Sequence, residues 1–600
     1  MMPLLEFSPI DCYFGRFLKE VSGEERKEFL LICSLVSRLT RDGHICLDLE
    51  EIANTSLSLP DGPFRLPSLD KLRDILLRNS TVGLPGEFKP LILDGNNRLY
   101  LYRYWWYEDR LARYLAEKSK EEEEISPILR GSWETRLRKY LPPERDLWQE
   151  LAVCLALFKK LIVISGSPGT GKTTTIAKIL ALLIEMKPNP TPSIFLAAPT
   201  GKAAIRIKEA IRKVKEALPC PEEVKKVIPD EAYTIHRLLG VTRNLTSFRY
   251  HEGNPLPADL VVVDEASMLD LPLFAKFVAA LPKKVRLVLL GDKDQLTSVQ
   301  PGAVLGDICG GENIDIFSAS LVHKIATVTA LPMGIEVSSK ALALNDCLVE
   351  LKRNYRFDKE SGIAQVARAV REGNAELVLS LLVEGNFSDI RWIKGETFIP
   401  YLRSKIREGY GAYLNAARRG EIEKVFELFD SFRVLCALRR SIWGVEWLNR
   451  IIEGILKEEG LITSRGTWYE GKPLLITRND YRTGLFNGDV GIVLAHPNGE
   501  GMRAFFREPK GSIRHFFLPH LPPYEVAYAM TVHKSQGSEF DRVLIVLPEE
   551  DNPLLTRELI YTALTRAKVG VEIWARATIL RNSILRQERR KSGLRDKLWK

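Results

Sequence analysis

The middle of the chain alternates short apolar runs with longer amphipathic segments. Continuous apolar, β-branched runs of this length are typical of strands buried on both faces of a parallel sheet. The amphipathic segments between them have the length of crossover helices. The pattern predicts a doubly wound α/β domain over residues 145–345, with strands at Leu161–Ser165, Ile194–Ala198, Leu260–Val263 and Val285–Leu290.

The same alternation returns in the C-terminal half of the chain, with apolar runs at Phe432–Leu438, Val543–Leu547 and Val571–Trp574. Between about residues 470 and 522 the helical period gives way to short strand-like runs and turns such as Asn487-Gly488-Asp489. We therefore expect a second α/β unit over residues 346–600 that carries a small β-rich insertion at about 470–522.

The first 144 residues follow a different pattern. Residues 1–112 hold mixed apolar segments and end in an aromatic stretch, Leu99 to Tyr107. These rings pack in a core or at a subunit contact, which is the commoner role, or they stack on bases. The charged run Lys118 to Glu124 and the proline after it indicate a boundary, because like charges repel and proline interrupts a helix. We expect a separate N-terminal domain over 1–112 and a linker over 113–144.

Composition narrows the class of protein. The 600 residues are 45% hydrophobic and 27% charged, which is ordinary for a multidomain globular chain. No apolar run approaches the roughly 18 residues that a membrane helix needs. The eight cysteines form no CxxC pair, so the sequence encodes neither a zinc ribbon nor a disulfide framework. Since the N-terminus has no basic leader, the expected location is the cytoplasm.

The charge balance fits a polyanionic partner without identifying one. The chain has 86 basic and 77 acidic residues, a net charge of +9, and the distribution of charge matters more than its sum. Part of the excess lies in the tail from Arg576 to Lys600. That tail forms either a solvated terminal helix or a contact with nucleic acid.

One segment has the pattern of a phosphate-binding loop. The GxxxxGK[ST] motif stands between a predicted strand and a predicted helix, which is the context it requires. Its glycines let successive backbone N–H groups point at an anion near the positive end of the helix. Lys172 then lies over the β- and γ-phosphates of ATP, and the Thr173 hydroxyl ligates Mg²⁺. The predicted ATP-binding residues are Gly166, Ser167, Pro168, Gly169, Thr170, Gly171, Lys172 and Thr173.

Two adjacent acids follow the predicted strand at Leu260–Val263. Asp264 ends up at the carboxyl edge of the sheet beside the phosphate loop, where it can hold Mg²⁺. Glu265 is placed to activate the attacking water. A carboxylate in this position favours ATP hydrolysis over transfer to a small substrate, because a kinase uses a substrate hydroxyl in place of an activated water.

Further motifs follow these in order over residues 145–575, and together they resemble the motif series of superfamily 1 DNA helicases. The sequences of several motifs, including TIHRLLG, NDYRTGLFNGDVGI and AMTVHKSQGSEF, are similar to the RecD branch, which includes the α subunits of exodeoxyribonuclease V (RecBCD). The segments are Trp148–Ala152, Ala197–Ala204, Thr234–Gly240, Gly291–Leu296, Leu351–Phe357, Asn479–Ile492, Ala529–Phe540 and Tyr561–Ala567.

The resemblance implies roles for individual residues. Gln149 would hydrogen-bond the adenine edge, Glu539 would contact the ribose, and Gln295 would sense the γ-phosphate and the attacking water. Arg356 and Arg566 would reach from the second α/β unit as arginine fingers, because a planar guanidinium suits spread transition-state charge better than an ammonium. The catalytic set is then Lys172, Glu265, Gln295, Arg356 and Arg566.

The resemblance also implies two RecA-like domains, an SH3-like insertion and a track for single-stranded DNA. Side chains of the track would grip phosphates without recognising sequence. The implied activity is ATP-dependent 5′ to 3′ translocation with Mg²⁺, in a heterotrimer with RecB and RecC that repairs and recombines broken duplex ends. Residues 1–112 would then contact the partner subunits, and any nuclease would reside on a partner. The track residues are Thr200, Lys202, His236, Thr531, His533 and Lys534.

Other functions stay open at the level of sequence. The chain is alternatively a free-standing RecD-like helicase, an RNA helicase, or a scaffold whose ATP site stabilises an assembly. The scaffold is disfavoured because binding alone needs neither Glu265 nor arginine fingers. Residues 307–348 separate two helicase motifs by a weakly patterned stretch, which is either an insertion or a mobile loop.

Overall fold

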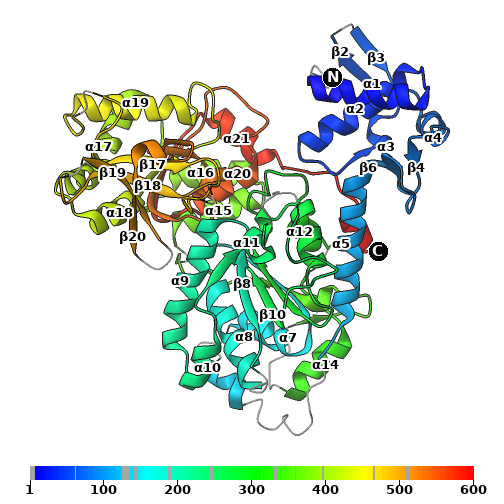
Figure 1. Cartoon of the computed structure of the whole chain (residues 1–600), viewed down its shortest axis with the longest axis horizontal. Coiled ribbons are helices and arrows are strands. Elements are labelled where there is room, and N and C mark those ends of the chain that lie inside the picture. Colours follow the sequence, from blue (N-terminus) through cyan, green and yellow to red (C-terminus); the bar gives the residue numbers. More distant parts are fainter. Residues whose placement is uncertain are drawn as a thin grey trace.

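The computed structural model has four parts, an N-terminal domain, two α/β domains and a small β domain (Figure 1). The described residues are 7–60, 62–123, 135–140, 146–186, 191–241, 247–311, 314–328, 335–358, 360–394, 397–463, 466–480, 482–499, 501–508 and 512–600. Within these ranges no helix combines the length and the hydropathy that a bilayer crossing requires.

The N-terminal domain packs helices against a four-stranded sheet in the order β1-β6-β5-β4, and a separate hairpin, β2–β3, projects from it (Figure 1). Apolar residues from both layers form its core. Its elements are α1 (Pro9–Ser22), α2 (Lys27–Arg41), β1 (Cys46–Asp48), α3 (Leu49–Ile52), β2 (Ser56–Leu59), β3 (Gly62–Arg65), α4 (Leu69–Leu77), β4 (Val82–Gly83), β5 (Leu91–Leu93) and β6 (Arg98–Leu101).

The first α/β domain is a six-stranded parallel sheet with the order β14-β7-β11-β10-β8-β9. Apolar side chains line both of its faces, since separate cores form on the two sides. The strands are β7 (Leu161–Gly166), β8 (Ile194–Ala198), β9 (Ala232–Thr234), β10 (Leu260–Val263), β11 (Arg286–Gly291) and β14 (Leu348–Leu351). The main helices are α7 (Leu147–Phe158), α8 (Lys172–Met186), α9 (Gly201–Ala217), α10 (Glu222–Val227), α11 (Ile235–Leu239), α12 (Leu271–Ala279), α13 (Val304–Ile308) and α14 (Ala319–Val328).

The second α/β domain repeats this design with a five-stranded parallel sheet, β15-β24-β23-β16-β22, and a core on each face. Its strands are β15 (Ile390–Ile393), β16 (Phe432–Cys436), β22 (Ala529–Thr531), β23 (Phe540–Val546) and β24 (Ala567–Trp574). Its helices are α15 (Gly362–Arg371), α16 (Ala375–Glu384), α17 (Phe398–Arg418), α18 (Ile422–Asp430), α19 (Val445–Glu458), α20 (Arg557–Leu564) and α21 (Ala577–Leu585).

The predicted insertion is an antiparallel sheet with the order β20-β19-β18-β17-β21. It extends slightly past the expected end at residue 522, because its last strand closes the sheet. The strands are β17 (Lys472–Ile476), β18 (Val490–Ala495), β19 (Met502–Arg507), β20 (Ile513–Phe517) and β21 (Tyr524–Val526). The predicted fold class, two α/β domains with a β-rich insertion and an N-terminal domain, is therefore confirmed.

The domain boundaries differ from those expected. Helix α5 (Tyr102–Lys120) begins in the N-terminal domain and runs down the side of the first α/β domain, so the proposed division at residue 112 falls inside a helix (Figure 1). The boundary expected at 345/346 between the two α/β domains is also too early, because β14 pairs with β7 as an edge strand of the first sheet. The chain therefore leaves the first α/β domain after Leu351.

The acidic run after α5 is paired with the first α/β domain. Glu122 contacts Lys159 at 2.9 Å, and Glu123 contacts Lys160 and Arg286. Basic partners thus offset the mutual repulsion on which the prediction of a linker rested. Residues 124–134 and 141–145 of the expected linker lie outside the described residues.

The aromatic stretch at the start of α5 belongs to a core. Tyr100, Trp105 and Tyr107 are buried in the apolar cluster that lies between α5 and the first sheet. Trp106 is 39% exposed and stacks with Arg110. The first of the two roles considered for this stretch, packing in a core, is the one observed.

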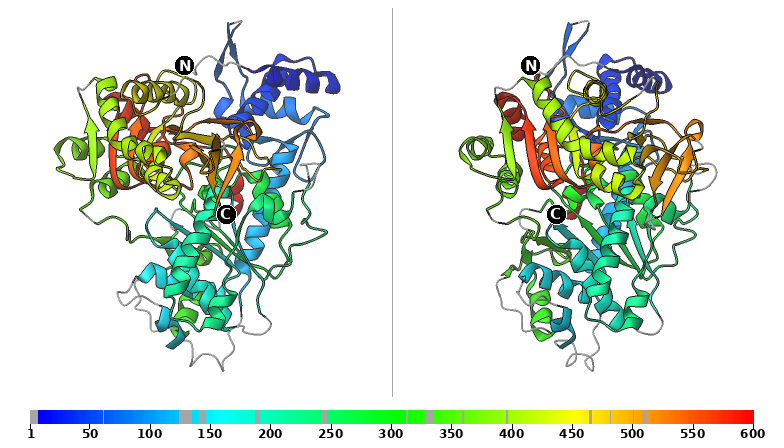
Figure 2. Two further views of the ribbon diagram at one scale, coloured as in Figure 1. Left: turned by 60° about the vertical axis from the view of Figure 1, so that its left-hand side comes forward. Right: turned by 90° about the vertical axis from the view of Figure 1, so that its left-hand side faces the viewer.

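The basic tail is not the free, solvated terminal helix that was one of the two forms expected. After α21 the chain crosses back over the molecule, and α22 (Leu594–Leu598) docks between α5 and α13 (Figures 1 and 2). Asp596 pairs with Arg98, and the backbone N–H of Gly593 donates to Glu108. The tail therefore ties the second α/β domain to the N-terminal domain and to the first α/β domain.

Residues 307–348 hold short elements that complete the first domain. They include α14, the short parallel pair β12 (Ile316–Phe317) and β13 (Glu336–Val337), and the edge strand β14. Residues 312–313 and 329–334 lie outside the described residues.

Candidate functional site

The phosphate loop joins β7 to α8 at the carboxyl edge of the first sheet. Gly169 and Gly171 have φ angles of 89° and 83°, a left-handed conformation that costs a side-chain-bearing residue strain. A Cβ atom at Gly171 would also lie 2.7 Å from Nε2 of Gln149. The backbone conformation therefore requires glycine at both positions, and Gly171 also leaves room for the Gln149 amide.

Lys172 lies inside the loop that it follows. Its ammonium donates to the carbonyl oxygens of Gly166 at 2.5 Å and Ser167 at 3.2 Å. Burial lowers the pKa of Lys172, while the carboxylates of Asp292, Glu265 and Asp264 oppose that shift. A desolvated ammonium in the first turn of α8, at the positive end of that helix, is a site for a polyphosphate.

Gln149 and Tyr355 flank the outer side of the loop. The Gln149 amide donates to the carbonyl of Thr170 at 3.4 Å and accepts from Lys178 at 3.2 Å. The hydroxyl of Tyr355 donates to Asp146, which also caps the N-terminus of α7. Tyr355 was not singled out from the sequence, although it lies beside Arg356 in a recognised motif, and its ring is 49% exposed.

The two acids predicted from the β10 motif lie next to this loop. Glu265 donates its backbone N–H to the carboxylate of Asp264 at 2.8 Å and has a left-handed φ of 53°. Burial and the neighbouring Glu265 raise the pKa of Asp264, and Lys172 lowers it. Thr173 stands in the first turn of α8, half-buried. Thus Lys172, Asp264 and Glu265 are brought together as expected.

The second α/β domain closes directly onto this edge. Nη2 of Arg566 donates to Oε1 of Gln295 at 2.8 Å, and Gln295 donates to Asp292 at 3.0 Å. Tyr561 of α20, five residues before Arg566, also donates to Asp292 at 3.0 Å. Arg566 is 1% exposed, so its charge is held within the boundary between the two domains. Asp292 and Tyr561 are site residues that we did not select from the sequence, although both stand in the motifs quoted above.

Arg356 is placed differently from expectation. It follows β14 of the first sheet, so it does not come from the second α/β unit. Its neighbours hold the phosphate loop, since Asn354 donates to the carbonyl of Pro168 and Tyr355 donates its N–H to that of Gly169. The Arg356 guanidinium itself pairs with Glu539 of the second domain.

Glu539 has a second basic partner, Arg206 of α9. Arg206 is also 3.7 Å from the carboxylate of Glu265. Burial raises the pKa of Glu539, but Arg206 and Arg356 outweigh that effect and the net shift is downward. No motif drew attention to Arg206, because its neighbours in the fold are far away in the sequence.

The predicted DNA track is brought together in part. Thr200 caps α9, and burial lowers the pKa of Lys202 to about 8, with Arg433 and Lys534 acting in the same direction and Asp430 and Asp489 against it. Lys534 donates its backbone N–H to Thr531. These residues place Lys202 of the first domain near Lys534 of the second.

The two histidines predicted for the track have other neighbours. His236 lies beside the ring of Phe248, with 5.9 Å between centroids, and burial lowers its pKa. Burial also lowers the pKa of His533, whose charged neighbours are Glu588 and Arg590 of the C-terminal tail.

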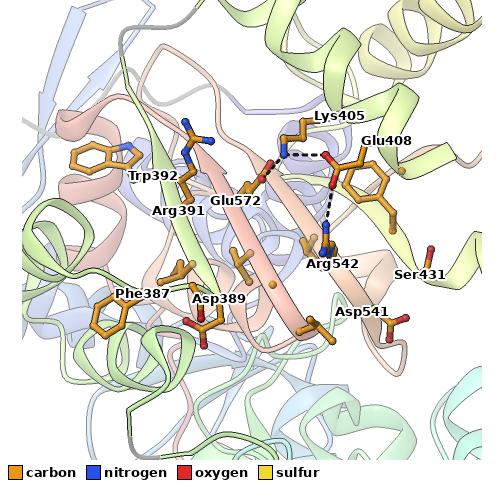
Figure 3. Close-up of a pocket in the computed structure, with 18 of the residues that line it drawn as sticks. Phe387, Asp389, Arg391, Trp392, Lys405, Glu408, Ser431, Asp541, Arg542 and Glu572 are labelled. Atoms are coloured by element: carbon orange, nitrogen blue, oxygen red, sulfur yellow. Dashed lines mark hydrogen bonds and ion pairs between the residues drawn. The ribbon is translucent and has the colours of Figure 1, made fainter. Parts of the chain in front are cut away.

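A cavity of 910 Å³ lies elsewhere in the second α/β domain, over the starts of β15, β23 and β24 and beneath α17 (Figure 3). Four of its charged side chains pair with one another, because Lys405 contacts Glu408 and Glu572, and Arg542 contacts Glu408. None of the residues predicted for the ATP site or the track lines it.

Comparison with known proteins identifies the family of the chain. Family models match the chain at residues 6–100 (RecBCD enzyme subunit RecD, N-terminal domain), 149–301 (AAA domain) and 526–572 (UvrD-like helicase C-terminal domain). The chain is 36% identical over 611 residues to the RecBCD enzyme subunit RecD of Mycolicibacterium smegmatis, with 100% of this chain and 99% of that protein aligned.

Two further relatives show how far the likeness extends. The RecD subunit of Haemophilus influenzae is 36% identical over 524 residues, which cover 83% of this chain and 79% of that protein. The ATP-dependent RecD2 DNA helicase of Deinococcus radiodurans is 30% identical over 411 residues, 68% of this chain but 46% of that helicase. Because the match to RecD subunits spans both chains at 36% identity, the chain belongs to the RecD family of RecBCD enzyme subunits.

Proposed function

We propose that this chain, an ATP-dependent DNA helicase of the RecD family, moves 5′ to 3′ along single-stranded DNA. The observation that best supports ATP-driven movement is the hydrogen bond between Arg566 of the second α/β domain and Gln295 of the first. The carboxylate of Glu265 in the first domain also stabilises the charged form of Arg566 and so raises its pKa, against the effect of burial. Because the walls of the cleft belong to different domains, ATP binding and hydrolysis change their separation, and that motion displaces a bound strand.

In the proposed hydrolysis, Lys172 and the backbone N–H groups of residues 169–173 hold the triphosphate. Glu265 orients and activates the attacking water, and Gln295 contacts that water and the γ-phosphate. Arg356 and Arg566 stabilise the charge that spreads over the equatorial oxygens of the transferred group, a contribution of roughly 10³ to 10⁵ in rate for arginines of this kind.

Mg²⁺ is the metal that suits the donors present. The half-buried carboxylate of Asp264 and the hydroxyl of Thr173 are hard oxygen ligands next to the phosphate loop. Bound there, Mg²⁺ would neutralise charge on the β- and γ-phosphates.

The nucleoside end of ATP would lie against Gln149 and Tyr355. The Gln149 amide presents both a donor and an acceptor to the adenine edge. The half-exposed ring of Tyr355 offers a stacking surface for the base, and Glu539 is proposed to accept from the ribose. Glu539 would then have to leave one of its arginine partners when ATP binds.

The proposed DNA track crosses both domains. Thr200, Lys202 and His236 lie on the first α/β domain, whereas Thr531, His533 and Lys534 lie on the second. Hydroxyl, imidazole and ammonium groups contact phosphates without recognising bases, which suits an enzyme that moves over any sequence. Support is firmest for Lys202 and Lys534, because the charge of Lys534 is close enough to help lower the pKa of Lys202.

We further propose RecB and RecC as partners in a heterotrimer that acts on duplex DNA ends in double-strand break repair and recombination. The full-length match to RecD subunits favours this assembly over a free-standing helicase, since less than half of the RecD2 helicase is matched. Any exonuclease activity would belong to a partner subunit.

The N-terminal domain carries a surface suited to a partner. Ile10, Tyr13, Phe17 and Val21 stand at helical spacing on one face of α1 and are 59–66% exposed. The opposite face of α1 packs on α2. A contiguous exposed apolar stripe of this kind is typical of an interface. Phe17→Asp should therefore release the chain from co-purifying RecB and RecC, whereas Asp70→Lys, at an exposed position on α4 of the same domain, should not.

Directionality and assembly are tested together by unwinding assays on duplexes with 5′ or 3′ tails, with and without RecB and RecC. The expected result is unwinding from 5′ tails that requires Lys172 and ATP. Equal or greater unwinding from 3′ tails by the isolated chain would contradict the proposed direction. Unaltered co-purification of the Phe17→Asp variant would contradict the proposed contact surface.

A further inference from the structure

Helix α9 connects the proposed DNA track with the ATP site. Its N-terminal cap is Thr200, and Lys202 stands in its first turn. Arg206 follows Lys202 by four residues, so the two side chains project from the same face of the helix. With a rise of about 1.5 Å per residue, about 6 Å of rigid helix separates them.

The start of α9 also touches the second α/β domain and its insertion. A Cβ atom at Gly537 would lie 3.5 Å from Ala203, which is buried. A Cβ atom at Gly488 of the insertion would lie 4.0 Å from Cε of Lys202. A shift of the second domain, or a strand bound at Lys202, therefore acts on this end of the helix.

Arg206 stands where the same helix meets the hydrolysis machinery. Its Nη1 atom lies 3.7 Å from Oε1 of Glu265, and its other terminal nitrogen pairs with Glu539. Glu539 also pairs with Arg356. Charges thus alternate across the cleft in the order Glu265, Arg206, Glu539, Arg356.

Arg206 is the member of this series that neither the motifs nor the proposed hydrolysis has used. Burial opposes its charge, but Glu539, Glu265 and Asp264 more than compensate, and the pKa of Arg206 is raised. Its guanidinium is therefore a fixed cation that two carboxylates share, one on each domain.

We propose that Arg206 is a positioning residue that couples DNA contact on α9 to ATP hydrolysis by holding Glu265 and Glu539. This inference rests on the proposed function. When bound single-stranded DNA displaces α9, or when the domains close, Arg206 moves with the helix. It then changes the position of the Glu265 carboxylate relative to the attacking water. Misplacement of a reacting group by about 1 Å can cost about 10² in rate, so a small shift is sufficient.

The competing explanation is that Arg206 merely braces the fold with a cross-domain ion pair. In that case its loss would lower the melting temperature and reduce ATP turnover by the same factor with and without DNA. A positioning role predicts instead a change in the ratio of those two rates, with the KM for ATP little altered. It also predicts partial rescue by lysine, which keeps the charge but loses the fork that reaches two carboxylates.

The test compares the full-length chain with its Arg206→Gln, Arg206→Lys and Arg206→Ala variants. The control is Arg212→Gln, an exposed position farther along α9. ATP turnover is measured with and without saturating oligo(dT), together with oligo(dT) affinity, fluorescent ADP affinity and the melting temperature. We expect the DNA stimulation factor of Arg206→Gln to fall at least tenfold, with oligo(dT) affinity within about threefold of the parent, and Arg206→Lys to recover part of the factor. Arg212→Gln should match the parent.

An unchanged stimulation factor in Arg206→Gln, or an equal loss in Arg212→Gln, would overturn the inference. If Arg206→Gln does not fold, Arg206→Lys decides, because its factor should lie between the parent value and unity. The Lys172→Gln variant distinguishes a failure of the proposed ATP site from a failure of the proposed coupling through Arg206. Residual turnover in that variant would refute the ATP site itself, whereas a dead Lys172→Gln beside an Arg206→Gln with full stimulation would refute the coupling alone.

Discussion

Replacement of Arg566 by lysine tests the cross-domain site most directly. The guanidinium has three partners, which are Oε1 of Gln295 at 2.8 Å, the carbonyl of Ser538 at 3.3 Å and the carbonyl of Thr562 at 3.2 Å. A lysine ammonium keeps the positive charge, but it cannot hold both backbone carbonyls of its own domain and still reach across to Gln295.

The magnitude follows from the role proposed. An arginine that stabilises the transition state of phosphoryl transfer contributes about 10³ or more in rate, which corresponds to about 4 kcal/mol at 1.36 kcal/mol per tenfold. The hydrogen bonds lost within the second domain cost folding stability about 1–3 kcal/mol. We therefore expect kcat to fall about 10³-fold with a folded protein and a KM for ATP within a few-fold of the parent.

The assay is steady-state ATP hydrolysis with saturating single-stranded DNA, with nucleotide affinity measured separately by a fluorescent ADP analogue. Arg581→Lys is the matched control, because Arg581 pairs with Glu376 on the surface of the same domain. Surface pairs of this kind contribute little, so its kcat should match the parent. A kcat within threefold of the parent in Arg566→Lys would refute the role of this arginine at the γ-phosphate.

Four other perturbations probe the rest of the site. Lys172→Gln should abolish DNA-stimulated hydrolysis while circular dichroism stays unchanged, and Glu265→Gln should keep ATP binding but lower kcat at least about 10²-fold. Tyr355→Ala should raise the KM for ATP about tenfold with kcat little changed, since it removes about 1–1.5 kcal/mol of ring contact. Because the pKa of Lys202 is lowered to about 8, its charge is present below that pH and is lost above it. Affinity for single-stranded DNA should therefore fall as pH rises through about 8, and less so in Lys202→Arg.

Each of these has a clear contrary outcome. Retained turnover in Lys172→Gln would remove the phosphate loop from the mechanism, and an unchanged kcat in Glu265→Gln would remove the proposed base. An unaltered KM for ATP in Tyr355→Ala would show that the adenine ring does not stack on Tyr355. If the parent and Lys202→Arg bind DNA with the same pH dependence, Lys202 does not contact the strand in its charged form.

Much of the architecture follows from local pattern. The apolar runs predicted at Leu161–Ser165 and Leu260–Val263 lie within one residue of β7 and β10, because strands buried on both faces must be apolar throughout. The phosphate loop is likewise a local structure, since its left-handed glycines and the start of α8 lie within eight consecutive residues.

The position of Arg356 shows what the sequence pattern cannot predict. The family resemblance implies that Arg356 reaches from the second α/β unit, yet β14 just before it adds to the first sheet beside β7. Strand order within a sheet depends on long-range hydrogen bonding, which neither periodicity nor motif order encodes. The tail is a similar case, because its basic residues suggested solvent or nucleic acid, but Lys597 pairs with the buried Glu108.

The sequence by itself determined the chemistry that neighbouring residues can perform: the phosphate loop, the acids after β10, the two α/β patterns and the membership of the RecD family. The tertiary structure alone decided which charges share a partner, as when Arg206 and Glu539 meet although 333 residues separate them. The physical reason is range. Helical and strand periods act over a few residues, whereas an ion pair across a cleft exists only after several independently packed domains have come together.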